Sequence, residues 1–257
     1  MIAAPRHFAA LAGRLRWDPA AIDLRADALA WPALSLERRA RLTVLLAGFR
    51  VAESSVAEEL APFGPAADDR DTAAAFAAQH ADEKRHAALF DRVAAEVLGL
   101  PGEGPQERRA AARAVTPAAL LELFERRLPA AAAALATGRT DLAEAVGLYH
   151  MLLEGIVLGS GQRALLDDLA DGALPGVRAG VELVERDERW HVGFGLRCLR
   201  DLEPDPTRVT TLLAEGEAAA AAWGDAVPVH VRARAEAMHR RRLVAVGLTR
   251  AAAGSRA

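Results

Sequence analysis

The sequence predicts an all-α fold, arranged as a long helical bundle, and three observations lead to that prediction. The chain of 257 residues is 52% hydrophobic and rich in Ala, Leu, Glu and Arg, which favour helices. No segment alternates apolar and polar residues as a half-buried strand does. Several segments of roughly thirty residues carry apolar residues at helical spacing, and helices of that length extend about 45 Å, as in an up-and-down bundle.

Proline- and glycine-rich breaks separate the expected helices. In chain order, the helices are expected at residues 35–61, 69–98, 117–138, 140–170, 175–202, 206–223 and 228–246. Pro62, Gly64 and Pro65 stop the first helix. The stretch GLPGEGP ends the second, and a short helix is expected directly after it.

Prolines also define the later helices. The third is expected to start at Pro117 and to kink at Pro129. Pro175 is well placed at the start of the fifth helix, which Pro204 and Pro206 close. All of these helices are expected to form a single domain over residues 1–257, with an irregular lead-in over 1–34 and a frayed tail over 247–257.

Charge and cysteine content exclude several classes of partner. The formal net charge of −3 gives no sign of a nucleic-acid or membrane-surface partner. No window of membrane-span length is free of charge, so no membrane span is expected. The one cysteine, Cys198, cannot form an intrachain disulfide, and residues 1–30 lack the pattern of a secretory signal. These observations predict a cytoplasmic location.

The pattern Asp-Glu-x-x-His occurs twice, in ADEKRHAALF and in RDERWHVGFG. Each copy lies on a helix whose core-facing stripe is otherwise largely apolar. Glu83 and His86 in the first copy, and Glu188 and His191 in the second, lie one turn apart on one helix face. Each pair therefore offers an oxygen donor and a nitrogen donor to one metal ion.

Two further glutamates, Glu53 and Glu154, each lie at the centre of a core-facing stripe on the helix before a motif. A buried carboxylate without a partner costs several kcal/mol, so four of them need cations nearby. Two divalent ions would balance four carboxylates and two neutral imidazoles. One Glu from each of two helices with Glu-x-x-His from two others is the ligand set of carboxylate-bridged dinuclear bundles. Ordinary surface acids are the alternative interpretation.

With these residues the chain resembles the ferritin-like superfamily that includes ribonucleotide reductase small subunits, and more narrowly its ligand-binding oxidase branch. The resemblance runs from RWDPAAIDLRADALAW through GFRVAESSVAEELAPF and HADEKRHAALF to ERDERWHVGFGLRCL. It implies a ferritin-like bundle with a dinuclear metal site in its core. The implied half-sites, with one Glu bridging them, are Glu53, Glu83 and His86, and Glu154, Glu188 and His191.

The resemblance also implies a cofactor of two metal ions, Mn/Fe or Fe/Fe, and activation of dioxygen. Asp82 and Asp187 would orient the imidazoles, or else lie on a solvated helix face. Phe90 stands where radical-storing reductase subunits carry a tyrosine. The only tyrosine, Tyr149, matches a residue that relatives join to a valine by an ether cross-link, and Val56 stands at the valine's position. Core packing is the alternative for both residues.

An oxidase of this kind implies a long-chain fatty acid or other small apolar ligand, and a homodimer. Three alternatives stay open. The first is a di-iron monooxygenase or desaturase-like enzyme with a separate small substrate and a reductase partner. The second is a ribonucleotide reductase small subunit, which the missing tyrosines disfavour. The third is ferritin-like iron storage, without an enzymatic function.

Weaker features allow two interpretations each. Gly155, Gly159 and Gly161 follow Glu154 and favour either space for a ligand or close helix packing. Gln162 stands where relatives often carry a second tyrosine. An arginine cluster near the end of the chain suggests an anionic partner or, more simply, a solvated helix face. Its members are Arg232, Arg234, Arg240, Arg241 and Arg242.

Overall fold

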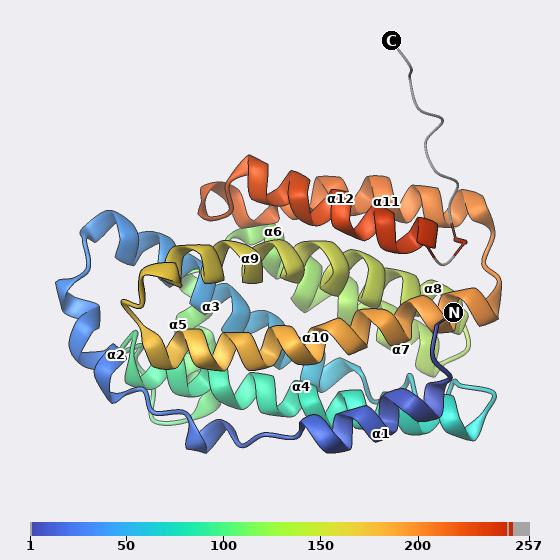
Figure 1. The fold of residues 1–257 in the computed structure, drawn as a ribbon, viewed down its shortest axis with the longest axis horizontal. Coiled ribbons are helices and arrows are strands. Elements are labelled where there is room, and N and C mark those ends of the chain that lie inside the picture. Colours follow the sequence, from blue (N-terminus) through green and yellow to red (C-terminus); the bar gives the residue numbers. More distant parts are fainter. Residues whose placement is uncertain (1, 246, 249–257) are drawn as a thin grey trace, which may run out of the picture.

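The computed structural model describes residues 2–245 and 247–248, and within that part the chain is helical with no strand (Figure 1). Four long helical segments lie side by side and form the core of the bundle. They are α3 (Leu36–Glu59), α4 (Arg70–Glu96), the segment α8–η4–α9 (Leu142–Val146, Gly147–Leu158 and Gly159–Asp168), and α10 (Pro175–Leu202). The predicted all-α, ferritin-like bundle is confirmed.

The core helices begin where the sequence places capping groups. The Ser35 side chain accepts a hydrogen bond from the Arg38 amide at 3.2 Å, and Asp69 accepts one from the Thr72 amide at 2.9 Å. Both satisfy a first-turn amide that has no partner inside its helix. Pro175 occupies the first position of α10, where its missing amide hydrogen costs nothing.

The expectation of an irregular lead-in over residues 1–34 is wrong in part. This segment contains two α-helices, α1 (Pro5–Leu15) and α2 (Arg25–Ala30), and two short 3-10 helices, η1 (Pro19–Ala21) and η2 (Trp31–Ala33). Helix α1 packs along α4 and α10 (Figure 1). Phe8 lies on the buried face of α1, and its ring centroid is 5.7 Å from that of Phe194 on α10. An 11-residue helix is marginal alone, so this packing stabilises it.

The helix expected at residues 117–138 is divided. A π-helical turn, η3 (Leu123–Arg127), separates α6 (Ala118–Glu122) from α7 (Leu128–Ala136). This wider turn ends two residues before Pro129, where the kink was expected. Proline has no amide hydrogen, so it cannot donate the backbone hydrogen bond that a regular α-helix needs at that position. The short helix expected before it is α5 (Pro105–Val115).

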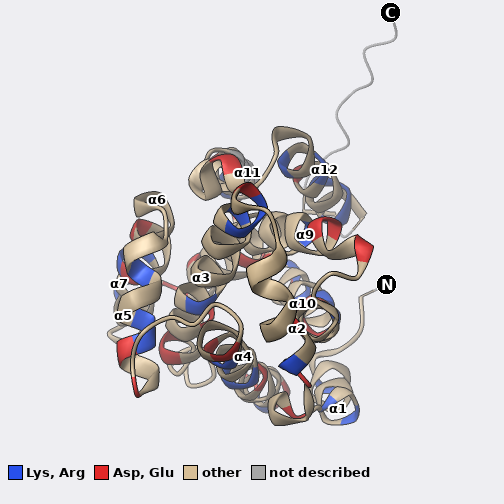
Figure 2. Cartoon of the chain, turned by 90° about the vertical axis from the view of Figure 1, so that its left-hand side faces the viewer, with Lys and Arg blue, Asp and Glu red and all other residues tan. Residues whose placement is uncertain are grey.

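The last two helices cover one side of the bundle, along the top of Figure 1. They are α11 (Pro206–Ala220), which packs on η4, and α12 (Val229–Ala245), which packs on η4 and α9. Of the predicted frayed tail over 247–257, residues 249–257 lie outside the described part of the chain. Viewed along the bundle, charged residues cover the outer helices, with acidic and basic residues interspersed (Figure 2).

The helical segment Leu142–Asp171 is long and apolar enough to cross a membrane when judged by length and composition alone. However, 83% of its most apolar window is buried inside the protein. Glu154 also lies near its middle, among the core helices. Burial against neighbouring helices therefore accounts for its apolar character.

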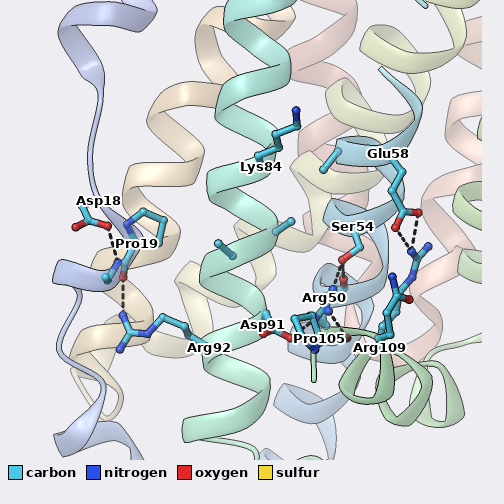
Figure 3. A pocket seen from close by; sticks show the side chains of 15 residues that line it. Asp18, Pro19, Arg50, Ser54, Glu58, Lys84, Asp91, Arg92, Pro105 and Arg109 are labelled. Carbon is cyan, nitrogen blue, oxygen red and sulfur yellow. Dashed lines mark hydrogen bonds and ion pairs between the residues drawn. The ribbon is translucent and has the colours of Figure 1, made fainter. Parts of the chain in front are cut away.

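A network of arginines and one aspartate joins α3, α4 and α5 beside a cavity of about 640 Å³ (Figure 3). Arg50 Nε lies 3.0 Å from Asp91 Oδ1, and Arg50 Nη2 donates to the Pro105 carbonyl at 2.6 Å. Arg108 donates to the same aspartate. The Arg50 and Asp91 side chains are only 4% and 15% exposed. Because little water reaches them, each charge needs the other to offset the cost of its burial.

Asp91→Ala is expected to lower the free energy of unfolding by about 3 kcal/mol, because it leaves the Arg50 guanidinium buried without a counter-ion. Urea denaturation of the metal-free protein measures this change. Glu122→Ala is the control, since its pair with Arg126 is exposed and contributes little. Equal effects of the two substitutions would contradict the assignment of a stabilising buried pair.

Candidate metal centre

The structure brings the six predicted ligands together in the core. Each long helical segment contributes: Glu53 comes from α3, Glu83 and His86 from α4, Glu154 from η4, and Glu188 and His191 from α10. All six side chains are buried. They form two groups whose donor atoms lie within 4.8 Å of one another and could each hold a metal ion. The groups are Glu53, Glu83, His86 and Glu188, and Glu83, Glu154, Glu188 and His191.

Both imidazoles turn Nδ1 toward the carboxylates. His191 Nδ1 lies 2.9 Å from Glu83 and 3.3 Å from Glu188. His86 Nδ1 lies 3.2 Å from Glu83 and 3.4 Å from Glu188. The other two glutamates each lie 3.6 Å from one imidazole, Glu53 from His86 and Glu154 from His191. Glu83 and Glu188 are therefore shared by both groups, whereas the resemblance implied a single bridging Glu.

The aspartates of the two motifs lie behind the imidazoles, each serving the histidine of the other motif. Asp187 lies 3.4 Å from His86 Nε2, and Asp82 lies 3.5 Å from His191 Nε2. Both are nearly fully buried, which excludes the alternative of a solvated helix face. With Nε2 facing a carboxylate, Nδ1 is left free to bind a cation.

Two tryptophans hold these aspartates. Trp17 Nε1 donates to Asp187 at 2.7 Å, and Trp190 Nε1 donates to Asp82 at 3.2 Å. The contribution of Trp17 was not predicted, because it comes from the segment expected to be an irregular lead-in. Its only signal in the sequence was a tryptophan directly before an aspartate and a proline.

The electrostatics of the cluster match a site that needs cations. Burial raises the pKa of Glu53 to about 8, and burial together with the charge of Glu188 raises the pKa of Glu154 well above its usual value. Burial acts in the same direction on Glu83, but His191 and His86 outweigh it and lower its pKa. These carboxylates cannot all be ionised in a dry core unless positive charge lies between them.

Unpartnered oxygens provide a direct test of whether metal ions fit. Both Oε atoms of Glu53, Oε2 of Glu154 and Oε1 of Glu188 are buried without a hydrogen bond from any described residue. Such atoms are rare in folded proteins because each loses its hydration without compensation. Carboxylate oxygens and imidazole nitrogens suit manganese and iron. The donor set therefore fits two divalent ions.

A hydrogen-bonded chain extends from the carboxylates to η4. Tyr149 Oη donates to Glu83 at 3.0 Å, and Gln79 Nε2 lies 3.2 Å from Tyr149 Oη and 3.1 Å from Glu154 Oε1. Gln79 Oε1 in turn lies 3.0 Å from His150 Nε2. Neither Gln79 nor His150 was predicted to have this role. The available signal was the position of Gln79, one turn before Glu83 on the same stripe.

Tyr149 and Glu154 lie on the π-helical segment η4, where the sequence predicted a regular α-helix. All of its 12 residues are buried. π-Helical turns are rare and often occur at functional sites, where they redirect side chains. Val56, on α3, is also fully buried, as is Tyr149. The predicted cross-link between Val56 and Tyr149 stays a prediction.

The glycines after Glu154 support both interpretations. Gly155 and Gly159 line a pocket that reaches Glu154 and Glu188. Gly155 and Gly161 also allow close packing, since a Cβ atom would lie 2.5 Å from the His239 ring at Gly155 and 2.5 Å from the Trp223 ring at Gly161. The pocket has a volume of about 210 Å³ and opens between α9, α10 and α12.

Comparisons with known proteins agree with this geometry. Residues 7–232 match the family described as "Ribonucleotide reductase, small chain". A mutant R2-like ligand-binding oxidase with anaerobically reconstituted Mn/Fe cofactor superposes with a TM-score of 0.78 at 19% identity, over 93% of each chain. Another superposes with a TM-score of 0.77 at 19% identity, over 96% of this chain and 87% of that one. At this identity the structural likeness shows a shared fold.

The match to the family covers most of the chain, including all six convergent side chains and both tryptophans behind them. The chain belongs to the ribonucleotide reductase small-chain family.

Proposed function

We propose that this protein is a dioxygen-activating oxidoreductase of the ligand-binding oxidase kind, with a dinuclear Mn/Fe or Fe/Fe centre. The observation that carries the proposal is the pair of buried donor groups sharing Glu83 and Glu188. When bound, the two metal ions supply the activation of dioxygen and the oxidation of a nearby C–H bond.

The protein's own residues have distinct roles in this proposal. Glu53 and His86 would hold one ion and Glu154 and His191 the other, while Glu83 and Glu188, which belong to both donor groups, would serve both ions. Asp82 and Asp187 keep each imidazole oriented with Nδ1 toward its ion. The apolar side chains around the cluster exclude water, which limits side reactions.

Metal analysis of the protein loaded without oxygen, followed by measurement of dioxygen uptake, tests the proposal. We expect two ions per chain, in keeping with the two donor groups, and uptake of dioxygen that a metal-free sample lacks. Many more irons per chain would favour ferritin-like storage instead. A metal count near zero would refute the oxidase.

Several observations favour an oxidase over a radical-storing subunit. Phe90, which stands in the radical tyrosine's place, stacks on Phe49 with ring centroids 5.1 Å apart and has no oxidisable hydroxyl. The only tyrosine in the chain is Tyr149. Co-purification with a large catalytic subunit would revive the reductase alternative. Turnover of a separate small substrate with a reductase partner would favour a monooxygenase or desaturase-like enzyme.

Exposure of the metal-loaded protein to oxygen is expected to join Val56 to Tyr149 through an ether bond. One C–H and one O–H hydrogen are lost to dioxygen as the oxidant, so the intact mass falls by that of two hydrogen atoms. The Tyr149 hydroxyl lies beside Glu83, which supports the assignment. Intact-mass measurement of aerobic and anaerobic samples tests it, with Tyr149→Phe as the control. An unchanged mass in the aerobic sample would rule the cross-link out.

The proposed ligand is a small, partly apolar molecule, for which the resemblance suggests a long-chain fatty acid. The pocket that reaches Glu154 and Glu188 is the proposed binding site. At about 210 Å³ it is smaller than the roughly 300–1,000 Å³ of pockets for drug-sized ligands, so a long chain would extend past its mouth. A homodimer and a cytoplasmic location complete the proposal.

A further inference from the structure

A buried glutamine connects Tyr149 to the carboxylates of the metal centre. Gln79 lies on α4, one turn before Glu83, and is fully buried. Its Nε2 lies 3.1 Å from Glu154 Oε1 and 3.2 Å from Tyr149 Oη, and its Oε1 lies 3.0 Å from His150 Nε2. Gln79 belongs to neither donor group, so holding a metal ion does not account for it.

The chemistry of Glu154 fixes the direction of these hydrogen bonds. As a metal ligand Glu154 is ionised, and the oxygens of an ionised carboxylate can only accept. The nitrogen of the Gln79 amide must therefore face Glu154, and the amide oxygen must face His150. Because an amide oxygen also only accepts, His150 Nε2 carries a hydrogen and donates it to Gln79. In keeping with this, His150 Nδ1 has no hydrogen-bond partner in the described part of the chain.

The same direction decides what the Tyr149 hydroxyl does. The Gln79 amide has two hydrogens, of which one faces Glu154 and the other faces Tyr149 Oη. The Tyr149 oxygen therefore accepts from Gln79, and its own hydrogen goes to Glu83 Oε1, 3.0 Å away. The amide also occupies Glu154 Oε1, so that oxygen does not compete for the hydroxyl hydrogen. Tyr149 is thus joined to a carboxylate that both donor groups share.

Packing holds His150, and through it the amide, in place. Tyr149 and His150 are adjacent on η4, with ring centroids 4.5 Å apart. A π-helix has more residues per turn than an α-helix, so adjacent side chains diverge less and both can reach α4. On its other side His150 lies against α10, where a Cβ atom at Gly195 would lie 2.3 Å from the His150 Cβ. The fold therefore fixes the donor that orients Gln79.

We propose that Gln79 is a positioning residue, which makes the Tyr149 hydroxyl a hydrogen-bond donor to Glu83 and so directs the loss of its proton when Tyr149 reacts. The inference rests on the proposed function, since it concerns the cross-link between Tyr149 and Val56. In that reaction a C–H bond of Val56 and the O–H bond of Tyr149 break, and a C–O bond forms. Two electrons and two protons pass to dioxygen, the phenolic proton by way of Glu83 Oε1.

Ultraviolet resonance Raman spectroscopy of the metal-loaded protein, kept anaerobic, tests the direction of these hydrogen bonds. Tyr149 is the only tyrosine in the chain, so the tyrosine signal reports one side chain. The intensity ratio of the tyrosine ring doublet distinguishes a hydroxyl that both donates and accepts from one that only donates. We expect the first in the wild type and the second in Gln79→Leu, which cannot donate. An identical ratio in both proteins would overturn the inference.

Two further variants separate positioning from a general loss of structure. His150→Phe keeps an aromatic ring beside Tyr149 but removes the donor that orients the amide, so its ratio should lie between those of the wild type and Gln79→Leu. Gln162→Leu is the matched control, because Gln162 is also a buried glutamine, 3% exposed, whose Nε2 has no partner in the described ranges. It should show the wild-type ratio.

Circular dichroism verifies that each of these variants is folded. Equal changes in Gln162→Leu and Gln79→Leu would overturn the inference. If Gln79→Leu does not fold, a wild-type ratio in His150→Phe overturns it instead.

Exposure to oxygen then measures the consequence for the reaction. The fraction of chains that are lighter by two hydrogen atoms should grow about tenfold more slowly in Gln79→Leu than in the wild type, since one hydrogen bond contributes about that factor. Equal rates in the two proteins would show that Gln79 does not direct the reaction.

Metal content and dioxygen uptake, measured on the same samples, separate this inference from the proposed function. Because Gln79 is in neither donor group, Gln79→Leu should still hold two ions. A wild type that holds no metal refutes the oxidase itself. A wild type that holds two ions and consumes dioxygen, but matches Gln79→Leu in Raman ratio and in rate, remains an oxidase in which Gln79 does not position Tyr149. A loaded wild type whose mass does not fall in oxygen removes the reaction, and with it the role of Gln79, but not the metal centre.

Discussion

Replacement of Glu188 by alanine is expected to abolish binding of the metal pair. Glu188 belongs to both donor groups, so its loss removes a ligand from each ion at once. Loss of a residue that merely supports a metal ligand costs about 10- to 100-fold in affinity, and loss of a shared ligand should cost more than about 100-fold. Equilibrium dialysis with Mn²⁺ or Fe²⁺ under anaerobic conditions measures the change.

Glu185→Ala is the matched control for this substitution. Glu185 lies one turn earlier on α10 and pairs with Arg189 outside both donor groups. We expect it to bind both ions with nearly unchanged affinity. If Glu188→Ala retained both ions as tightly as Glu185→Ala does, the shared-ligand assignment would be wrong.

Glu53→Gln is expected to change stability in opposite directions with and without metal. In the metal-free protein, Glu53 is fully buried, and neither carboxylate oxygen has a hydrogen-bond partner among the described residues. A neutral amide removes the cost of a buried charge, so metal-free Glu53→Gln should be more stable than the wild type by a few kcal/mol at pH 8. With metal bound, the order should reverse, because the amide is the poorer ligand and ligand binding stabilises the folded state.

The same substitution predicts a pH dependence. The folded-state pKa of Glu53 is raised by burial from 4.5 to about 8, so the folded state binds its proton more tightly than the unfolded state does. Between these values the metal-free wild type therefore loses stability as pH rises, by at most about 1.4 kcal/mol per pH unit from this group. Glu53→Gln should remove this part of the slope.

Urea denaturation from pH 5 to pH 8 in the presence of a chelator, and again with metal, measures both effects. His86 and His191 also contribute stability that falls as pH rises above about 6.5, because the neighbouring carboxylates overcome burial and raise the folded-state pKa of each, so the folded state keeps protons that the unfolded state loses. Glu53 is one of the carboxylates that raise the pKa of His86, so the difference between wild type and variant reports the charge of Glu53 together with its effect on His86. A variant that is less stable than the wild type in chelator at pH 8 would contradict a buried, uncompensated charge.

Much of the fold and the centre of the site could be predicted because both depend on local periodicity. Helical spacing places Glu83 and His86 on one face whatever surrounds them, and the same holds for Glu188 and His191. Proline and glycine breaks gave the bounds of α10 directly, at Pro175 and Leu202. A charged residue inside an apolar stripe is informative because it is costly.

The remaining features depend on tertiary packing, which local patterns do not contain. Helix α1 is short and is stabilised by Phe8 packing against α10, so propensity alone did not reveal it. Asp82 and Asp187 each lie behind the histidine of the other motif, and this crossed arrangement depends on how α4 and α10 face each other. The π-helical geometry of η4, likewise, has no reliable signature in a single sequence.

The arginine cluster illustrates the same limit. Arg232, Arg241 and Arg242 look equivalent in the sequence, yet only the last two line the pocket. Packing decides which face of α12 turns toward α9 and α10. It also decides where Gln162 lies relative to that face. The sequence alone therefore left the cluster's role open between an anionic partner and a solvated surface.

Crystallography of the metal-loaded protein, with anomalous data at the manganese and iron absorption edges, would locate the two ions themselves. We expect two anomalous peaks in the core, one beside Nδ1 of His86 and the other beside Nδ1 of His191, with Glu83 and Glu188 between them. A loaded crystal with no peak among these side chains, or with ions bound only at the surface, would contradict this expectation.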